Sequence, residues 1–362
     1  MAAIPLCLED FEPLARARVR ADHWDYVAGG SGSERALAAN RAAFARVALR
    51  PRVLVDVSTC ATATTLLGLP VAGPVAVAPT AYHRMLHADA ELATARGAAD
   101  AGALYIASFF SNHPLEEIAA AGGDAPRWLQ LYWLRDREAF GGVVDRAAVA
   151  GYAALVLTVD TPVIGQRLRD ARNGFALGPD MAPGNVTLRT DLLRRPGEKG
   201  RSALADQALL TFDPSITWAD LDWLRARSPL PLVLKGIVTA EDAGLAVRHG
   251  VDAIVVSNHG GRQLDNPIGT LDVLPEVVDA VAGRCPVLVD GGVRTGHDVV
   301  VALALGADAV LIGRPVLWGL AVDGATGVTR VLDLLRAELA HVMALIGRPS
   351  IDSIDRSAVR PG

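Results

Sequence analysis

Short apolar segments recur along this chain, and most of them end in a polar or glycine-containing group. Most are separated by two to three dozen residues with helical character, as in 90–101, 239–248 and 295–305. Continuous apolar runs indicate strands that are covered on both faces, as in a parallel sheet wrapped by helices. The order predicts an α/β fold, a closed TIM (β/α)8 barrel, whose active site lies at the C-terminal ends of the strands. The eight segments begin at Val75, Leu104, Trp128, Leu155, Leu232, Ala253, Val287 and Ala309.

The length of 362 residues fits one elaborated barrel without a second domain. We expect a single domain over 1–362, with an N-terminal extension (1–70) of helices and a short hairpin, and the barrel over 75–347. The long segment 179–213, after the fourth strand, is predicted to be a mobile, lid-like loop on the catalytic side. Its basic residues are expected to be solvated and not to bind an anionic partner; they are Arg189, Arg194, Arg195, Lys199 and Arg201.

Charge and hydropathy limit the partners of the chain. A net charge of −5 argues against nucleic acid, whose binding leaves a strongly basic surface. No segment approaches the ~18 apolar residues that span a bilayer, and Glu9, Asp10 and Glu12 stand where a secretory signal would be apolar. These features predict a cytoplasmic location without membrane attachment. The three cysteines lack metal-site spacing, so reduced thiols and no metal are expected at Cys7, Cys60 and Cys285.

The stretch from Ser257 to Asp265 carries the strongest chemical signal. It follows the apolar run 253–256, so His259 and Arg262 emerge together where a strand turns into a loop. Gly260 and Gly261 permit the backbone to fold back, which would let the imidazole and the guanidinium face one ligand. A lone His-x-x-Arg is more often structural, but nine residues of this composition at a strand end favour chemistry. A base beside an anion clamp suits a substrate that bears a carboxylate.

Groups at the other strand ends predict a cofactor. Glycines and arginines follow the last two strands, at 290–295 and 313–314, where barrels commonly bind phosphate. Lys235 would be a fixed cation in the barrel mouth, and beside a flavin it would favour the anionic reduced ring. Ser108, Gln130 and Thr158 would then bond the polar edge of that ring. A Rossmann nicotinamide site is unsupported, because no GxGxxG occurs in a strand-to-helix turn.

From Trp24-Asp25-Tyr26 to about residue 347, the chain resembles the FMN-dependent 2-hydroxy acid oxidase and dehydrogenase family, which includes glycolate, lactate and hydroxymandelate oxidases and mandelate dehydrogenase. The resemblance implies that His259 is the catalytic base and Asp160 its partner. Arg262 and Arg167 would clamp the substrate carboxylate, and the hydroxyls of Tyr26 and Tyr132 would contact the substrate. It also implies a homotetramer or octamer, and an FMN site formed by Pro79, Thr80, Ala81, Ser108, Gln130, Thr158, Lys235, Ser257, Asp290, Gly291, Gly292, Arg294, Gly313 and Arg314.

The chain departs from this pattern around the substrate. Val163 and Gln166 stand where relatives that act on small hydroxy acids often carry arginine, and Phe110 replaces a common tryptophan. Residues 81–83 and 173–176 resemble hydroxymandelate oxidase more than glycolate oxidase. We therefore expect an (S)-2-hydroxy acid oxidase that acts on a mandelate-like substrate, with oxygen as acceptor and hydrogen peroxide as co-product.

Four alternatives remain open on the sequence. In the first alternative, the substrate is a short-chain acid such as glycolate or lactate. In the second, the electrons pass to a quinone or another acceptor. A non-redox phosphate-binding barrel, such as an isomerase, explains Gly313-Arg314 but leaves His259, Arg262 and Tyr132 without a task. A catalytically silent flavin-binding protein conflicts with the intact base and clamp. The enantiomer, and whether the base takes the carbon-bound or the hydroxyl proton, are not fixed by the residues.

Overall fold

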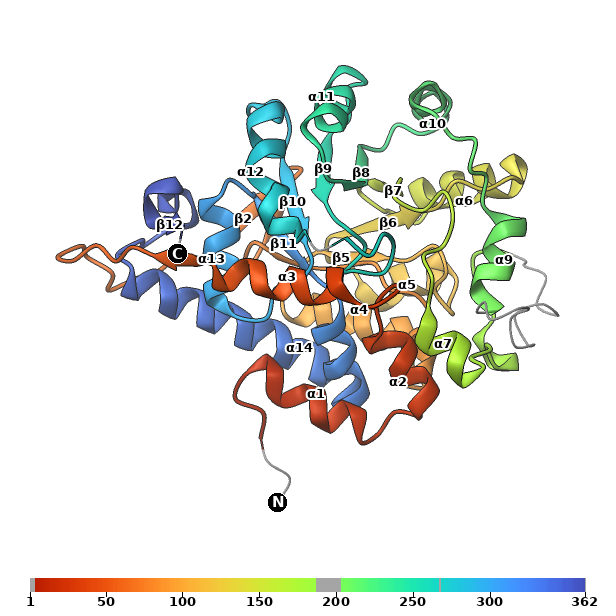
Figure 1. The fold of residues 1–362 in the computed structure, drawn as a ribbon, viewed down its shortest axis with the longest axis horizontal. Helices are drawn as coiled ribbons and strands as arrows, with labels where there is room; N and C mark the ends of the chain where they lie inside the picture. The colour runs from red at the N-terminus through yellow and green to blue at the C-terminus, as the bar shows by residue number, and fades with distance from the viewer. Residues whose placement is uncertain (1–3, 187–202, 267, 362) are drawn as a thin grey trace.

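The computed structural model describes residues 4–186, 203–266 and 268–361, and its centre is a closed barrel of parallel strands (Figure 1). Each barrel strand pairs with the next one along the chain, and β11 pairs with β4 to close the ring. The predicted (β/α)8 barrel is therefore confirmed. Its strands are β4 (Val75–Val77), β5 (Tyr105–Ala107), β6 (Arg127–Leu131), β7 (Leu155–Thr158), β8 (Leu232–Ile237), β9 (Ala253–Val256), β10 (Val287–Asp290) and β11 (Ala309–Ile312).

Side chains alternate between the interior of the barrel and its outer layer, as the pleat of a strand requires. Ala76, Leu104 and Trp128 belong to an inner apolar cluster, whereas Val75 and Val77 join a larger cluster that includes the surrounding helices. A hairpin of β2 (Thr64–Leu66) and β3 (Leu69–Val71) precedes the barrel, and its side chains at 66 and 71 join the inner cluster. The short hairpin expected in the N-terminal extension therefore packs on the inner layer of the barrel.

Helices cover the outside of the barrel (Figure 1). Asp136, Thr239 and Thr295 cap three of them by accepting a hydrogen bond from the backbone three residues on, which satisfies an amide of the first turn. The last helix is kinked at Asp323 and Gly324, where the backbone leaves helical geometry. The helices are α4 (Ala90–Asp100), α5 (Leu115–Gly122), α6 (Arg137–Val149), α10 (Leu221–Arg227), α11 (Ala240–Arg248), α12 (Thr270–Val281), α13 (Gly296–Ala304) and α14 (Arg314–Leu345).

The N-terminal extension packs against the barrel and is helical where the sequence predicted helices. Helix α1 (Leu8–Arg16) contacts α14, and α3 (Arg35–Ala45) contacts α12. Helix α2 (Ala21–Ala28) contacts α7 (Leu168–Asn173), which follows β7. The strand β1 (Val47–Leu49) pairs with β12 (Val359–Pro361), so the C-terminal strand is joined to the N-terminal extension just after α3. Short 3-10 turns lie at His83–Met85, Pro179–Met181, Trp218–Asp220, Ile351–Ser353 and Arg356–Ala358.

The segment after β7 is more regular than the sequence suggested. The prediction of an unpatterned loop over 179–213 is wrong for α9 (Ala203–Thr211), a helix of nine residues. Phe212, just beyond it, forms an isolated antiparallel bridge with Leu134 after β6, which fixes the end of α9 beside the barrel. Residues 187–202, with the basic side chains that we expect to be solvated, lie outside the described residues.

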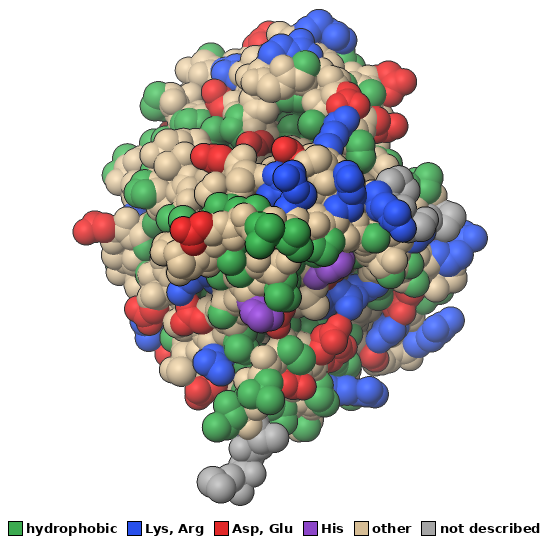
Figure 2. Space-filling model, turned by 90° about the vertical axis from the view of Figure 1, so that its left-hand side faces the viewer, with side chains coloured by type: hydrophobic (Ala, Val, Ile, Leu, Met, Phe, Trp, Pro, Cys, Tyr) green, Lys and Arg blue, Asp and Glu red, His purple; other side chains and the backbone are tan. Residues whose placement is uncertain are grey.

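The surface carries charges of both signs. On the face shown in Figure 2, acidic and basic side chains are interspersed with apolar ones over most of the area. Within the described ranges, no helix combines the length and the apolar character that crossing a bilayer requires.

Candidate active site

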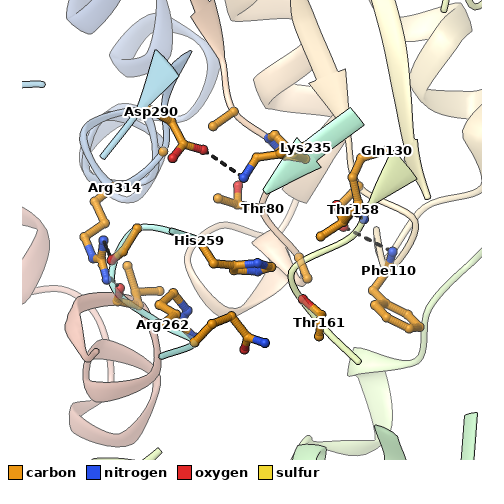
Figure 3. Close-up of a pocket in the computed structure, with 18 of the residues that line it drawn as sticks. Thr80, Phe110, Gln130, Thr158, Thr161, Lys235, His259, Arg262, Asp290 and Arg314 are labelled. Atoms are coloured by element: carbon orange, nitrogen blue, oxygen red, sulfur yellow. Dashed lines mark hydrogen bonds and ion pairs between the residues drawn. The ribbon is translucent and has the colours of Figure 1, made fainter. Parts of the chain in front are cut away.

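One cavity lies at the C-terminal ends of the barrel strands (Figure 3). Its floor is set by the same alternation that fills the barrel. Val156, Val233 and Leu288 point inward, so Thr158, Lys235 and Asp290, two residues further on, point inward one layer higher. Ser257 follows this rule but is fully buried and does not line the cavity. The other residues predicted to hold FMN all line it: Pro79, Thr80, Ala81, Ser108, Gln130, Thr158, Lys235, Asp290, Gly291, Gly292, Arg294, Gly313 and Arg314.

Three polar side chains from neighbouring strands form a network in the floor. Gln130 Oε1 accepts hydrogen bonds from Ser108 Oγ at 3.3 Å and from the backbone of Phe109 at 3.2 Å. Gln130 Nε2 donates to Thr158 Oγ1 at 3.0 Å. The amide is thereby oriented, and the three side chains present fixed donors and acceptors to a planar polar ligand.

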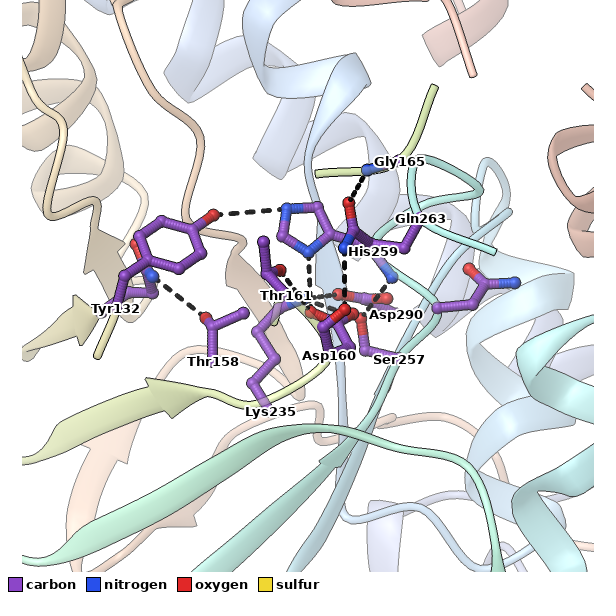
Figure 4. A network of polar contacts seen from close by, with 12 residues as sticks. Tyr132, Thr158, Asp160, Thr161, Gly165, Lys235, Ser257, His259, Gln263 and Asp290 are labelled. Carbon is purple, nitrogen blue, oxygen red and sulfur yellow. Dashed lines mark hydrogen bonds and ion pairs between the residues drawn. The ribbon is translucent and has the colours of Figure 1, made fainter. Parts of the chain in front are cut away.

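Lys235 is a buried cation with a buried partner. Its Nζ lies 2.8 Å from Asp290 Oδ2 and donates to Ser257 Oγ at 2.7 Å (Figures 3 and 4). Ser257 Oγ also accepts from the backbone N–H of His259, so one hydroxyl holds both the cation and the histidine loop. Asp290 Oδ1 is buried and has no partner among the described residues. An unpartnered buried acceptor suits a hydroxylated ligand, since leaving it unbonded costs about 1–3 kcal/mol.

The last two strand ends form a cationic cradle. Burial lowers the pKa of Arg294 to about 10 and holds that of Arg314 well below its ordinary value, where Arg262 adds repulsion. No described carboxylate lies within ion-pair distance of either guanidinium. Gly292 lets the loop after β10 pack closely against helix α3, because a Cβ there would lie 2.3 Å from the carbonyl oxygen of Asn40. Two desolvated cations beside glycines fit a phosphate group.

His259 lies between a carboxylate and a phenol (Figure 4). Its Nδ1 is 3.0 Å from Asp160 Oδ1, and its Nε2 is 3.4 Å from the hydroxyl of Tyr132. Thr161 donates to the same oxygen of Asp160 at 3.0 Å. His259 itself has a φ of 59°, a left-handed conformation that costs energy outside glycine and recurs at functional sites. The ring is thus held with Nε2 toward the cavity.

Burial and two nearby cations favour the neutral form of His259. Burial lowers its pKa below the ordinary value, and Lys235 and Arg167 act in the same direction, although Asp160 opposes them. Burial opposes ionisation of Asp160, but His259 and Lys235 outweigh it, so the pKa of Asp160 is lowered. A neutral imidazole beside an ionised carboxylate is the state that a general base needs.

Two arginines reach the same cavity from different elements. The guanidinium of Arg262 lies 4.9 Å over the ring of Tyr26, and its Nη1 donates to the carbonyls of Tyr26 and Gly29 at 2.6 and 2.8 Å. Burial and the charge of Arg262 lower the pKa of Arg167 to about 9. Arg167 Nη1 is buried without a partner among the described residues. An anionic ligand would relieve both the burial and the repulsion.

Aromatic rings form one wall of the cavity. Phe110 stacks on Tyr132 at 5.4 Å and on Phe212 at 5.8 Å, and Tyr132 stacks on Phe212 at 4.8 Å. Tyr26 stacks on Phe175 at 5.0 Å nearby. The sequence analysis missed the residues that α9 and the segment after it supply, although their spacing is that of one helix face: Gln207, Ala208, Thr211 and Phe212. Thr161 and Ile164 also line the cavity and were missed, as do Tyr82 and Gln263, which lie in segments that the sequence singled out.

Two residues expected to set the substrate do not line the cavity. The side chain of Val163 is 55 % exposed, and neither Val163 nor Gln166 lines the cavity, so the prediction that they influence the substrate is not supported. Gln263 instead bonds the backbone there, donating to the carbonyls of Asp160 and Val163 and accepting from Gly165 (Figure 4). This loop therefore turns Val163 outward.

His83 acts behind the cavity wall. It is fully buried, and its ring lies 2.6 Å from Thr80 Oγ1 and 2.9 Å from Thr94 Oγ1. Its neighbour Tyr82 lines the cavity. Residues 81–83 thus shape the wall at Tyr82 and orient the hydroxyl of Thr80.

Fold and site together define a barrel enzyme that holds a phosphate-bearing cofactor and an anionic substrate side by side. A family model described as FMN-dependent dehydrogenase matches residues 15–361. The chain is 49 % identical to an L-lactate oxidase of Nostoc sp., over 98 % of this chain and 97 % of that protein. It is 48 % identical to a 4-hydroxymandelate oxidase of Amycolatopsis orientalis, over 98 % of each. This protein belongs to the FMN-dependent dehydrogenase family.

Solved structures agree with this assignment. A crystal structure of mandelate oxidase with (S)-4-hydroxymandelic acid matches the chain with a TM-score of 0.95, at 46 % identity and with 99 % of each chain covered. The residues present fit FMN: the cationic cradle suits its phosphate, the unpartnered Asp290 oxygen suits its ribityl hydroxyls, and the Gln130 network suits the edge of its ring.

Proposed function

We propose that this protein oxidises 2-hydroxy acids with an aromatic side chain to 2-keto acids and transfers the electrons to oxygen, forming hydrogen peroxide. The observation that carries the proposal is one cavity in which a carboxylate-paired histidine, an unpartnered arginine and a wall of aromatic rings meet. The names of the relatives, among them a 4-hydroxymandelate oxidase, support it.

FMN, held by the cationic cradle and the Gln130 network, would supply the two-electron redox chemistry that couples oxidation of the substrate to reduction of oxygen. The chain performs the other tasks. Arg262 and Arg167 bind the substrate carboxylate, because a guanidinium matches its two oxygens and fixes its plane. His259 takes one proton through Nε2, and Asp160 stabilises the imidazolium that results. The hydroxyl of Tyr132, 3.4 Å from Nε2, hydrogen-bonds to the reacting end of the substrate.

The aromatic wall favours a large side chain. Phe110, Tyr132 and Phe212 form an apolar surface beside His259, and burial of an aromatic ring contributes about 2 kcal/mol or more to binding. A hydrogen or methyl group, as in glycolate or lactate, would leave this surface uncovered. Mandelate-like acids are therefore the expected substrates.

The test is anaerobic reduction followed by a comparison of substrates. The purified protein should be yellow, bleach when mandelate is added without oxygen, and form peroxide when oxygen returns. We expect kcat/KM to be higher for (S)-mandelate than for lactate and glycolate. A tenfold or greater preference for lactate or glycolate would contradict the aromatic assignment but leave the redox chemistry standing. Failure of every hydroxy acid to bleach the flavin would contradict the redox chemistry itself.

Three further proposals concern the whole chain. We infer that 1–362 form one domain, since Tyr26 and Gly29 of the N-terminal extension hold Arg262. A cytoplasmic location and a homotetrameric or octameric assembly remain predictions. Fractionation of cells and light scattering of the purified protein would test them.

A further inference from the structure

Gln207 brings a buried polar group to the aromatic wall. It lies on α9, lines the same cavity as His259, and is 5 % exposed. Its Nε2 donates to Thr211 Oγ1 at 2.8 Å. Its Oε1 is buried and has no hydrogen-bond partner among the described residues. The roles proposed above for the other cavity residues leave this oxygen without a task.

The hydrogen bonds around Thr211 determine which end of the amide is the acceptor. Thr211 Oγ1 donates its single proton to the backbone carbonyl of Gln207, at 2.9 Å. In this arrangement the hydroxyl accepts from the side chain of Gln207, so the amide nitrogen faces Thr211. A flipped amide would place two acceptors against each other unless Thr211 gave up its bond to the backbone carbonyl. Oε1 is then the end of the amide that has no donor among the described residues.

The position of Gln207 suits the far end of an aromatic substrate. Phe212, on the same side of α9, stacks on Phe110 and on Tyr132. Figure 3 shows Phe110 on the opposite side of His259 from Arg262. A substrate whose carboxylate lies on the arginines thus extends its side chain past His259 toward the wall that α9 completes.

A buried acceptor without a partner discriminates between ligands. It costs about 1–3 kcal/mol when left unbonded, and a ligand that brings a donor recovers this cost. A site built to bond a hydroxyl group therefore selects against the analogue that lacks it. Within an otherwise apolar wall, the donor must lie at the end of a flat, apolar group.

We propose that Gln207 is a specificity-determining residue whose Oε1 accepts a hydrogen bond from a hydroxyl on the aromatic ring of the substrate. The preferred substrates are then ring-hydroxylated 2-hydroxy acids of the 4-hydroxymandelate type. This inference rests on the proposed function and adds the ring substituent to it.

The test compares 4-hydroxymandelate with mandelate in the FMN-loaded enzyme. We expect the wild type to favour 4-hydroxymandelate in kcat/KM, and Gln207→Leu to lower the ratio of the two values by about three- to tenfold, the size of one neutral hydrogen bond. Thr211→Val should lower the ratio less, because it frees the amide but keeps the acceptor. Leu209→Ala, on the exposed side of α9, is the matched control and should leave the ratio unchanged.

Ligand binding provides a readout independent of turnover. Titration of the oxidised enzyme with 4-hydroxybenzoylformate and with benzoylformate, followed by the flavin absorbance, should show the same loss of discrimination in Gln207→Leu. If both mandelates are oxidised but Gln207→Leu changes neither the ratio of the kcat/KM values nor the ratio of the affinities for the two keto acids, the role of Gln207 is wrong and the proposed function stands. If only lactate or glycolate is oxidised, both are wrong.

Discussion

Replacement of Asp160 by asparagine tests how the protein prepares His259 as a base. Asparagine keeps the size of the side chain and an oxygen that can accept from Nδ1, now 3.0 Å away. Only the negative charge is lost. Hydrogen bonds to charged groups contribute about 1.5–3 kcal/mol and neutral ones about 0.5–1.5 kcal/mol, so the imidazolium loses about 1–2 kcal/mol of stabilisation. At about 1.4 kcal/mol per tenfold change, kcat should fall about 5- to 30-fold.

The pH profile gives a second, independent readout. The base must be neutral, so activity is lost as the pH falls through the pKa of His259. Burial places that pKa below its ordinary value, and Asp160 is the neighbour that raises it. Without the charge the pKa of His259 falls further, and the acidic limb of kcat/KM against pH should move to lower pH. A purely structural defect would lower kcat without moving the limb.

Thr161→Val is the matched control. It removes the other hydrogen bond to the same oxygen of Asp160, at 3.0 Å, but keeps the charge. Its effect on kcat should be smaller than that of Asp160→Asn, and its acidic limb should stay nearer to that of the wild type. Flavin absorbance confirms that FMN is retained. An Asp160→Asn enzyme with wild-type kcat, or with its limb moved to higher pH, would refute the assigned pairing.

Three other changes test separate parts of the site. His259→Asn should lower kcat by about 10²- to 10⁴-fold with FMN still bound, since the imidazole does not belong to the cationic cradle, and near-normal turnover would eliminate it as the base. Arg262→Lys should raise KM for the hydroxy acid by about tenfold or more, because an ammonium cannot reproduce the planar fork, and an unchanged KM would remove Arg262 from the clamp. Asp265→Asn should make the free energy of unfolding depend less on pH under acidic conditions. Hydrogen bonds from Ser33 and Ala36 lower the pKa of Asp265 to about 2, so its contribution is present above the unfolded pKa of about 3.9 and is lost as the pH falls toward 2. Thermal melts between pH 2 and 6 that are parallel in both proteins would contradict this.

The floor of the cavity could be predicted from the sequence because it obeys a local rule. In a strand with a period of two, an inward apolar residue places the residue two positions on inside the barrel as well. Val156 before Thr158, Val233 before Lys235 and Leu288 before Asp290 all follow this rule. The strands and the functional residues at their C-terminal ends could therefore be predicted together.

The wall of the cavity could not be predicted in this way, because no local rule links it to the strands. Val163 is four residues from Arg167, yet Val163 is exposed whereas Arg167 lines the cavity, since Gln263 sets the path of the loop from about a hundred residues away. Gln207 lines the cavity on a helix whose end is joined to the barrel by the bridge between Phe212 and Leu134. Neither the helix over 203–211 nor its place beside the cavity was predicted from the sequence.

The N-terminal extension holds two arginines of the cavity in place without neutralising their charge. Arg262 and Arg314 lie in one cavity, and burial together with the charge of Arg262 lowers the pKa of Arg314. Carboxylates beside them would relieve the repulsion but would also cancel the charge that an anionic ligand needs. The C-terminal end of α2 and the residue after it offer backbone carbonyls instead: Gly29 accepts from both arginines, and Tyr26 and Val27 accept from one each. Helix C-termini favour cations through their partial negative charge, so the guanidinium groups are fixed while their full charge stays available.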